Sequence, residues 1–203
     1  MTAMTWKPVL SIPKTCLMLP LGGTEDPKEW AKRKCTELLG PEATDKTRRL
    51  FTETLAEETV KGRESRTQLL AGLFFYPDFN RYPPICDVDV DAFRPAPGDP
   101  PADLESWRES NGRPQKNTIG DIEITEVELP AGPALRFHER REQKVPHHGG
   151  HMIGESILYA VRPPEIRDSV TVTVTWMEPQ FGSRLIKMSD TIAQSLKIVP
   201  RED

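Results

Sequence analysis

The sequence predicts an α+β protein in which helices pack on an antiparallel sheet. Short runs in the last third alternate apolar and polar residues, a period of two that is typical of strands with one buried face. The turn between Pro130 and Pro133 joins two of these runs directly, so neighbouring strands are expected to run antiparallel. Two charged segments in the first third repeat apolar residues every three or four positions, which indicates helices that bury one side.

The first elements are predicted from the residues that begin and end them. The apolar segment 9–21 is interrupted by Pro13, which predicts one or two short strands. A helix is then expected to begin after Asp26, whose side chain caps the N–H groups of the first turn, with Pro27 at the first helical position. Gly40, which precedes a proline, ends this helix.

The middle of the chain contains two regular segments followed by an irregular one. An apolar stripe predicts a helix over 43–66, and the dense apolar run 69–76 predicts a buried strand. Eight prolines then mark 77–120 as a long excursion. Within it, 85–93 alternates like a strand, and 103–110 is long enough for two helical turns.

Four strands and a closing helix are predicted in the last third. Between Val170 and Trp176, valines alternate with threonines, so one face is expected to be buried while the threonines line the open face. Ser183 is expected to cap the closing helix, in which apolar residues recur at steps of three and four. The predicted strands span 122–129, 134–143, 153–161 and 170–176.

Composition excludes several classes of protein. The 203 residues carry a net charge of −4, which excludes a generic polycation. The chain also contains 20 prolines. No apolar run approaches the ~20 residues that a membrane helix needs. The length fits a single domain, 1–203, with a proline-rich acidic insertion at about 77–120. Because Lys and Arg are not clustered with aromatic residues, no nucleic-acid partner is expected.

The cysteines and the N-terminal segment predict the compartment. Cys16, Cys35 and Cys86 are widely spaced and odd in number, which favours reduced thiols over a disulfide framework. Residues 1–21 lack the basic segment and the continuous apolar stretch of a secretory signal. We therefore expect a cytoplasmic protein without a membrane partner.

One long run near the C-terminus is similar to a known fold. The run is SILYAVRPPEIRDSVTVTVTWMEPQFGSRLIKMSDTIAQSLKIV, with a strand, a loop, a threonine-rich strand ending in Trp176, and a terminal helix that carries Asp190. This half of the chain resembles the Mog1/PsbP-like fold, in particular its LpqN-type, actinobacterial lipoprotein-like branch. The resemblance implies a protein that binds partners, but it transfers no binding residue to this chain.

Three of the four histidines lie close together and suggest metal binding. His147, His148 and His151 stand around two glycines, and His138 lies on the preceding predicted strand. Imidazole binds zinc, copper or nickel, so this cluster is a candidate metal site. The alternative is a solvated, glycine-rich hairpin loop, since a stable site needs three or four ligands on a rigid frame.

A row of aspartates and one tryptophan are the candidate partner-binding residues. Asp87, Asp89 and Asp91 alternate along a predicted strand, so their carboxylates are expected on one face. Ala92 and Gly98 stand where a calcium loop of the EF-hand type needs Gly and Glu, so that site is excluded. The aspartates are interpreted as a solvated edge or as the complement of a basic partner. Trp107 is expected either to line a partner groove or to hold its loop on the domain.

The sequence contains no catalytic signature, since it lacks GxSxG, Walker and GxGxxG motifs. We therefore predict a cytoplasmic protein that is not an enzyme, has no cofactor and binds another protein. One alternative is a metal-binding protein or metalloenzyme that uses the histidine cluster. Another is a small-molecule binding module whose pocket lies between the sheet and the long loop.

Overall fold

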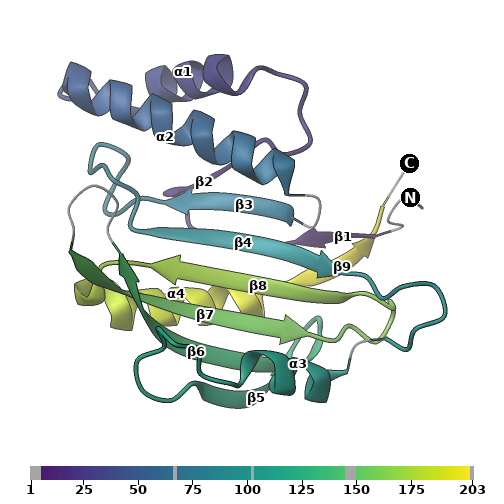
Figure 1. Ribbon diagram of the computed structural model, residues 1–203. Coiled ribbons are helices and arrows are strands. Elements are labelled where there is room, and N and C mark those ends of the chain that lie inside the picture. The colour runs from purple at the N-terminus through teal and green to yellow at the C-terminus, as the bar shows by residue number, and fades with distance from the viewer. Residues whose placement is uncertain (1–5, 66–67, 102, 145–149, 202–203) are drawn as a thin grey trace.

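The computed structural model describes residues 6–65, 68–101, 103–144 and 150–201. A seven-stranded antiparallel sheet, in the order β2-β3-β4-β8-β7-β6-β5, forms the centre of the protein (Figure 1). Four helices pack on this sheet, so the predicted α+β class is confirmed. The elements are β1 (Trp6–Val9), β2 (Cys16–Met18), α1 (Pro27–Leu38), α2 (Asp45–Glu64), β3 (Gln68–Phe74), β4 (Cys86–Phe93), α3 (Leu104–Asn111), β5 (Glu123–Leu129), β6 (Gly132–Lys144), β7 (His151–Val161), β8 (Ser169–Trp176), η1 (Pro179–Phe181), α4 (Gly182–Gln194) and β9 (Lys197–Pro200).

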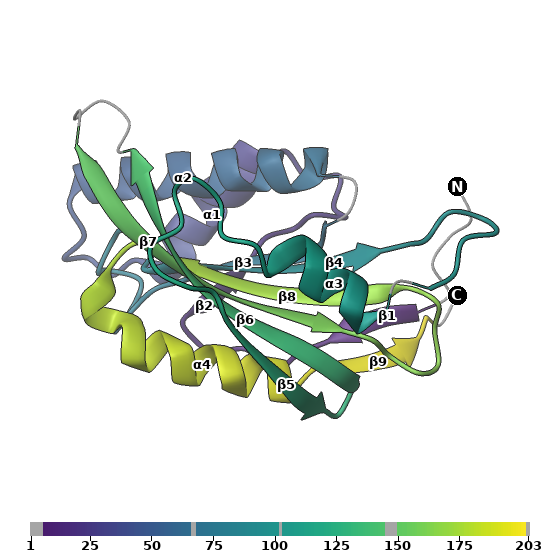
Figure 2. The same ribbon diagram turned by 60° about the horizontal axis from the view of Figure 1, so that its bottom comes forward.

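The helices cover the two faces of the sheet unequally. Figure 2 shows α1, α2 and α3 on one side and α4 on the other. Under α4, Leu185 and Ile192 pack against Val172, Val174 and other fully buried side chains. On the opposite side, α1 and α2 cover one end of the sheet and α3 covers the other, so the middle of that face lies between two helical walls.

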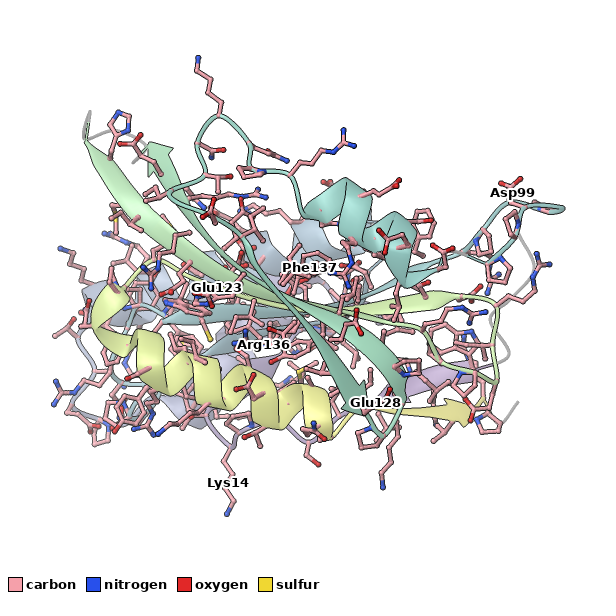
Figure 3. All side chains as sticks on the ribbon, turned by 90° about the horizontal axis from the view of Figure 1, so that it is seen from below. Lys14, Asp99, Glu123, Glu128, Arg136 and Phe137 are labelled. Atoms are coloured by element: carbon pink, nitrogen blue, oxygen red, sulfur yellow. The ribbon has the colours of Figure 1, made fainter. Side chains whose placement is uncertain are left out.

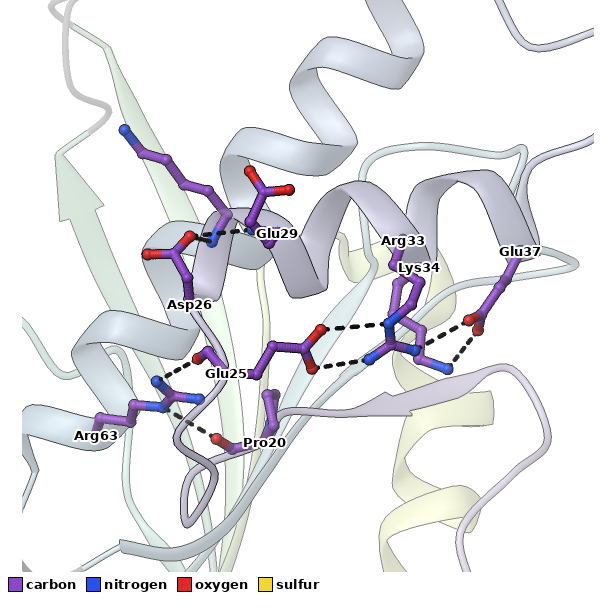
Figure 4. A network of polar contacts seen from close by, with 9 residues as sticks. Pro20, Glu25, Asp26, Glu29, Arg33, Lys34, Glu37 and Arg63 are labelled. Carbon is purple, nitrogen blue, oxygen red and sulfur yellow. Dashed lines mark hydrogen bonds and ion pairs between the residues drawn. The ribbon is translucent and has the colours of Figure 1, made fainter.

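The first helix begins as predicted. The Asp26 carboxylate accepts hydrogen bonds from the backbone N–H groups of Lys28 and Glu29, at 2.9 and 3.1 Å. Figure 4 shows this cap beside Arg63 of α2, which donates to the carbonyl oxygens of Pro20 and Glu25. These bonds tie the end of α2 to the segment that leads into α1, and so fix the helical pair on the sheet.

Two features of the C-terminal region differ from the prediction. Ser183 does not cap α4, because the helix continues directly from the η1 turn and Phe181 occupies the N-cap position without a side-chain hydrogen bond. The strand β9 was not predicted. It pairs with β1 in a separate two-stranded sheet, which brings the two ends of the described chain together.

The range predicted as an insertion contains an interior strand. β4 pairs with β3 on one side and with β8 on the other, and α3 follows it. The excursion at 77–120 thus contributes to the sheet as well as to the connecting loops. That the whole chain forms one domain remains our proposal. No helix within the described part of the chain combines the length and the apolar composition that a membrane span requires.

Candidate functional site

The candidate site is the open strip, the part of the sheet that α2 and α3 leave uncovered between them. Its floor is the outward face of β4 and β8, where each aspartate lies opposite a threonine. The pairs are Asp87 with Thr175, Asp89 with Thr173, and Asp91 with Thr171. Alternation along both strands sends these six side chains to the same side, as the sequence predicted for the aspartates.

A cavity of 260 Å³ lies beside the end of α3, where the open strip meets β6 and β7. Its wall includes Asn111 of α3, and its floor includes the hydroxyl groups of Ser156, Thr173 and Thr175. Within the described part of the chain, no protein group forms a hydrogen bond with these three hydroxyls. The cavity floor therefore offers hydrogen-bonding groups that the fold itself does not use.

An ion pair forms one side of this cavity. The Arg141 guanidinium lies 2.6 Å from the buried Glu139 carboxylate, which also accepts a hydrogen bond from the Thr118 hydroxyl. Burial alone would raise the pKa of Glu139, but the two donors outweigh it and hold the pKa below its ordinary value. The Nε atom of Arg141 is buried without a hydrogen-bond acceptor among the described residues.

The aspartates of the open strip lie against α2 in an acidic environment. A second hollow, of 140 Å³, is lined by Asp87 and Asp89 together with Glu58 and Lys61 of α2. Burial raises the pKa of Asp87 to about 7 and that of Asp89 to about 6, and repulsion between neighbouring carboxylates adds to the effect. Lys61 offsets part of the shift at Asp87.

Trp107 lies on the wall of the open strip. Leu104 and Trp107 of α3 pack on Phe137 and Leu135 of the sheet, and the Trp107 ring also contacts Phe93 at the end of β4. Asp87, Asp89, Asp91 and Trp107 therefore share one face of the molecule. That they bind a partner stays a prediction.

The opposite face carries a polar network that the sequence did not predict. The buried Glu155 carboxylate accepts hydrogen bonds from Trp176 Nε1 and Arg140 Nε, both at 3.1 Å, and lies 2.7 Å from His138 Nε2. Burial alone would raise the pKa of Glu155, but the contacts with His138 and Arg140 hold it below its ordinary value. The polar face of β6 is visible in the sequence, but Glu155 and Trp176 come from two other strands.

A hollow of 370 Å³ opens beside His138, with Asp121, Glu123 and Arg140 in its lining. Figure 3 shows Glu123 and Arg136 on the side of the sheet that α4 covers. Glu155 orients the imidazole, as a carboxylate does in many catalytic dyads. Among the described residues, its titratable lining consists of two carboxylates, one imidazole and one guanidinium.

One of the three predicted metal ligands, His151, lies among the described residues. His147 and His148 lie outside the described residues. His151 is exposed at the start of β7, where its Nδ1 lies 3.0 Å from a Glu142 carboxylate oxygen. Among residues that the structure does describe, no group of three or more His, Cys, Asp or Glu side chains is arranged to hold a metal ion.

Comparison with known proteins identifies a structural neighbour but no sequence relative. No family model matches the chain, and no curated protein matches it. A solved structure described as "LpqN involved in cell envelope biogenesis of Mycobacterium tuberculosis" is similar, with a TM-score of 0.50 and 10% sequence identity. The match covers 96% of this chain and 84% of that chain. The chain therefore has an LpqN-like fold. The broader Mog1/PsbP assignment is not specifically supported.

The comparison corrects the predicted compartment. We predicted a cytoplasmic protein because residues 1–21 lack the pattern of a secretory signal. The structural neighbour is described as a protein of cell envelope biogenesis, which contradicts that prediction. The pattern of the N-terminal residues is therefore an insufficient basis for assigning the compartment.

Proposed function

We propose that this chain is a non-enzymatic binding protein associated with the cell envelope, and that its ligand occupies the 260 Å³ cavity beside α3. Its LpqN-like fold supports the association with the envelope. The unused hydrogen-bonding groups on the cavity floor carry the assignment of the ligand site. The cavity lies between the sheet and Asn111, at the end of the long excursion, which is where a small-molecule pocket was expected.

The lining defines the chemistry of the ligand. The buried Arg141 N–H needs an acceptor, and the hydroxyls of Ser156, Thr173 and Thr175 both donate and accept. Glu139 and Arg141 neutralise each other, so the lining favours an uncharged ligand. Phe137 adds an apolar contact. A small uncharged molecule with several oxygen atoms fits these groups.

Ligand titration of matched variants tests this assignment. Thermal-shift and calorimetric titrations with a panel of uncharged, oxygen-rich metabolites should identify a compound that raises the melting temperature. Ser156→Ala and Thr175→Val should each weaken its affinity about tenfold, because each removes a hydroxyl contact. Ser183→Ala, on the exposed side of α4, should leave the affinity unchanged. A panel without binders, or a binder that is insensitive to both cavity variants, contradicts the proposal.

We also propose that the protein binds another protein, and a second observation supports this. Asp87, Asp89 and Asp91 stand in one row, and neighbouring carboxylates disfavour each other's ionised form. A positively charged side chain placed over the row would relieve that repulsion. Lysine-rich peptides should therefore bind the protein at low salt. Asp87→Asn with Asp89→Asn should weaken that binding, whereas Asp99→Asn, on an exposed loop, should not.

A further inference from the structure

The charge of the 260 Å³ cavity beside α3 depends on one arginine and its partner. Arg141 forms part of the cavity wall, and its side chain is partly exposed, so a ligand can reach the cation. Within the described part of the chain, the acceptor for this guanidinium is the Glu139 carboxylate, whose Oε2 lies 2.6 Å from Nη2. A guanidinium has several N–H donors, so one carboxylate oxygen does not use them all. Without Glu139, Arg141 would therefore attract anions into the cavity.

A second donor holds Glu139 in this position. The Thr118 hydroxyl donates a hydrogen bond of 2.6 Å to the other carboxylate oxygen, Oε1. The same hydroxyl accepts a hydrogen bond of 2.8 Å from the backbone N–H of Gln115, which leaves its own proton for Glu139. Each oxygen of this buried carboxylate thus has its own donor. Glu139 is therefore fixed beside Arg141 in its ionised form.

Thr118 in turn is fixed by the backbone of β6. It forms an isolated β-bridge opposite Arg141. Next to it, the Ile119 N–H donates to the carbonyl oxygen of Arg140 at 2.8 Å. Thr118 is not among the residues that line the cavity, so it acts on the cavity through Glu139. It is therefore a positioning residue.

The other charged residue of the described lining is Glu155, and it is already neutralised. Its carboxylate is bound by Arg140 and Trp176 and lies against His138, on the face of the sheet that α4 covers. The remaining polar groups of the lining are amides and hydroxyls, which carry no charge. The charge that a ligand meets in the cavity is thus set by Glu139 together with Arg141.

We propose that Glu139, positioned by Thr118, determines the charge specificity of this cavity: it neutralises Arg141, so that the site accepts uncharged, oxygen-containing ligands and rejects carboxylates of the same size. The proposal rests on the ligand-binding part of the proposed function and names the residue that selects the charge of the ligand. Once the Glu139 charge is removed, the Arg141 guanidinium is free to bind a carboxylate through charge-assisted hydrogen bonds. Glu139→Gln should therefore convert the cavity into an anion site.

Titration with two matched probes tests the proposal. Lactamide and lactate have nearly the same shape, but only lactate is charged at neutral pH. NMR shifts of the backbone amides of Gly154 and Ser156, which line the cavity, report binding. We expect Glu139→Gln to bind lactate about tenfold more tightly than the unmodified protein does, because it gains a charge-assisted contact. Glu139→Gln combined with Arg141→Gln should lose that gain.

Two variants of Thr118 test its role as a positioning residue and do not depend on the folding of Glu139→Gln. Thr118→Val removes the hydroxyl donor, so the pKa of Glu139 should rise and lactate should bind more tightly, though less so than in Glu139→Gln. Thr118→Ser keeps the donor and should leave both properties as they are in the unmodified protein. NMR of the Glu139 carboxyl carbon across a pH titration measures this pKa, which a merely structural role of Thr118 would not change.

Glu142→Gln is the matched control, because Glu142 lies on the opposite face of β6, where its carboxylate contacts His151. It should bind both probes like the unmodified protein. If Glu139→Gln gains no affinity for lactate, or if the double variant keeps the gain, the proposal is overturned. An unchanged pKa of Glu139 in Thr118→Val overturns the role of Thr118. If Glu139→Gln binds lactate while the unmodified protein binds neither lactamide nor the metabolite panel, the charge assignment stands and the proposed ligand-binding function fails.

Discussion

The two faces of the central sheet are made from the same strands but have opposite chemistry. On β8, Val170, Val172 and Val174 face α4 and are fully buried. The threonines between them face the open strip, where the ends of the face are covered and the middle is not. One strand therefore serves stability through one set of side chains and offers binding groups through the other.

This difference indicates where the protein tolerates change. Under α4, each side chain is surrounded by other side chains, so its removal leaves a void. On the open strip, Thr173 and Thr175 are only half-buried, so they can change without a large loss of stability. We therefore expect substitutions under α4 to affect folding, and substitutions on the open strip to affect binding.

Truncation under α4 should give the largest effect on stability. Leu185 is fully buried, and Leu185→Ala should lower the free energy of unfolding by about 3 kcal/mol because of lost apolar burial and the cavity left behind. Chemical denaturation measures this change. Thr173→Ala, on the other face of the sheet, is the control and should cost less than about 1 kcal/mol. Equal losses in the two variants would contradict the division of roles between the faces.

Exchanging residue types between neighbouring positions of β8 should sharpen the contrast between the face under α4 and the open strip. Val174→Thr places a hydroxyl group in the apolar layer under α4 and should cost about 2 kcal/mol. Thr175→Val, one residue further along, keeps the same shape on the open strip and should change stability by less than about 0.5 kcal/mol. Thermal unfolding of both variants tests this, and a larger loss for Thr175→Val would reverse the assignment of the faces.

A smaller effect is expected from the carboxylates of the open strip. The folded-state pKa values, about 7 for Asp87 and about 6 for Asp89, lie above the ordinary value of 3.8. At these two positions the folded protein therefore binds protons more tightly than the unfolded chain. The resulting stabilisation is complete below about pH 4 and is lost as the pH rises through about 6 to 7.

Asp87→Asn should remove part of this dependence of the folding stability on pH. It should stabilise the protein by about 1 kcal/mol at about pH 8, a value reduced for screening because Asp87 keeps solvent contact, and by almost nothing at about pH 4. Denaturation curves at both pH values measure the difference. Asp99→Asn serves as the control and should change stability at neither pH. A gain from Asp87→Asn that is no larger at about pH 8 than at about pH 4 would contradict the raised pKa of Asp87.

Local sequence patterns predicted most of the elements, because their physical causes are local. Asp26 and Pro27 mark the start of α1, since capping involves only the first turn. The alternation in β8 predicted a strand with one buried face. The same logic missed β9, whose four residues form a strand only because β1 provides the hydrogen-bonding partner. It also misassigned the cap of α4, where the η1 turn leads into the helix.

The candidate site was predicted only where it lies on one strand. A period of two suffices to place Asp87, Asp89 and Asp91 on one face of β4. The cavity beside α3 needs side chains from three strands and one helix, whose positions depend on strand order and register. The contact between Phe93 and Trp107 likewise joins residues on either side of the loop that links β4 to α3.

The sequence alone determined the α+β class, the helix and strand periodicities, and the row of aspartates, because these follow from neighbours along the chain. Only the tertiary structure decided that α4 covers one face, that α2 and α3 leave the open strip between them, and that Glu155 joins His138 to Trp176. These features depend on which strands pair and in which register. Strand pairing depends on packing between residues that are far apart in the sequence, and no local pattern encodes it.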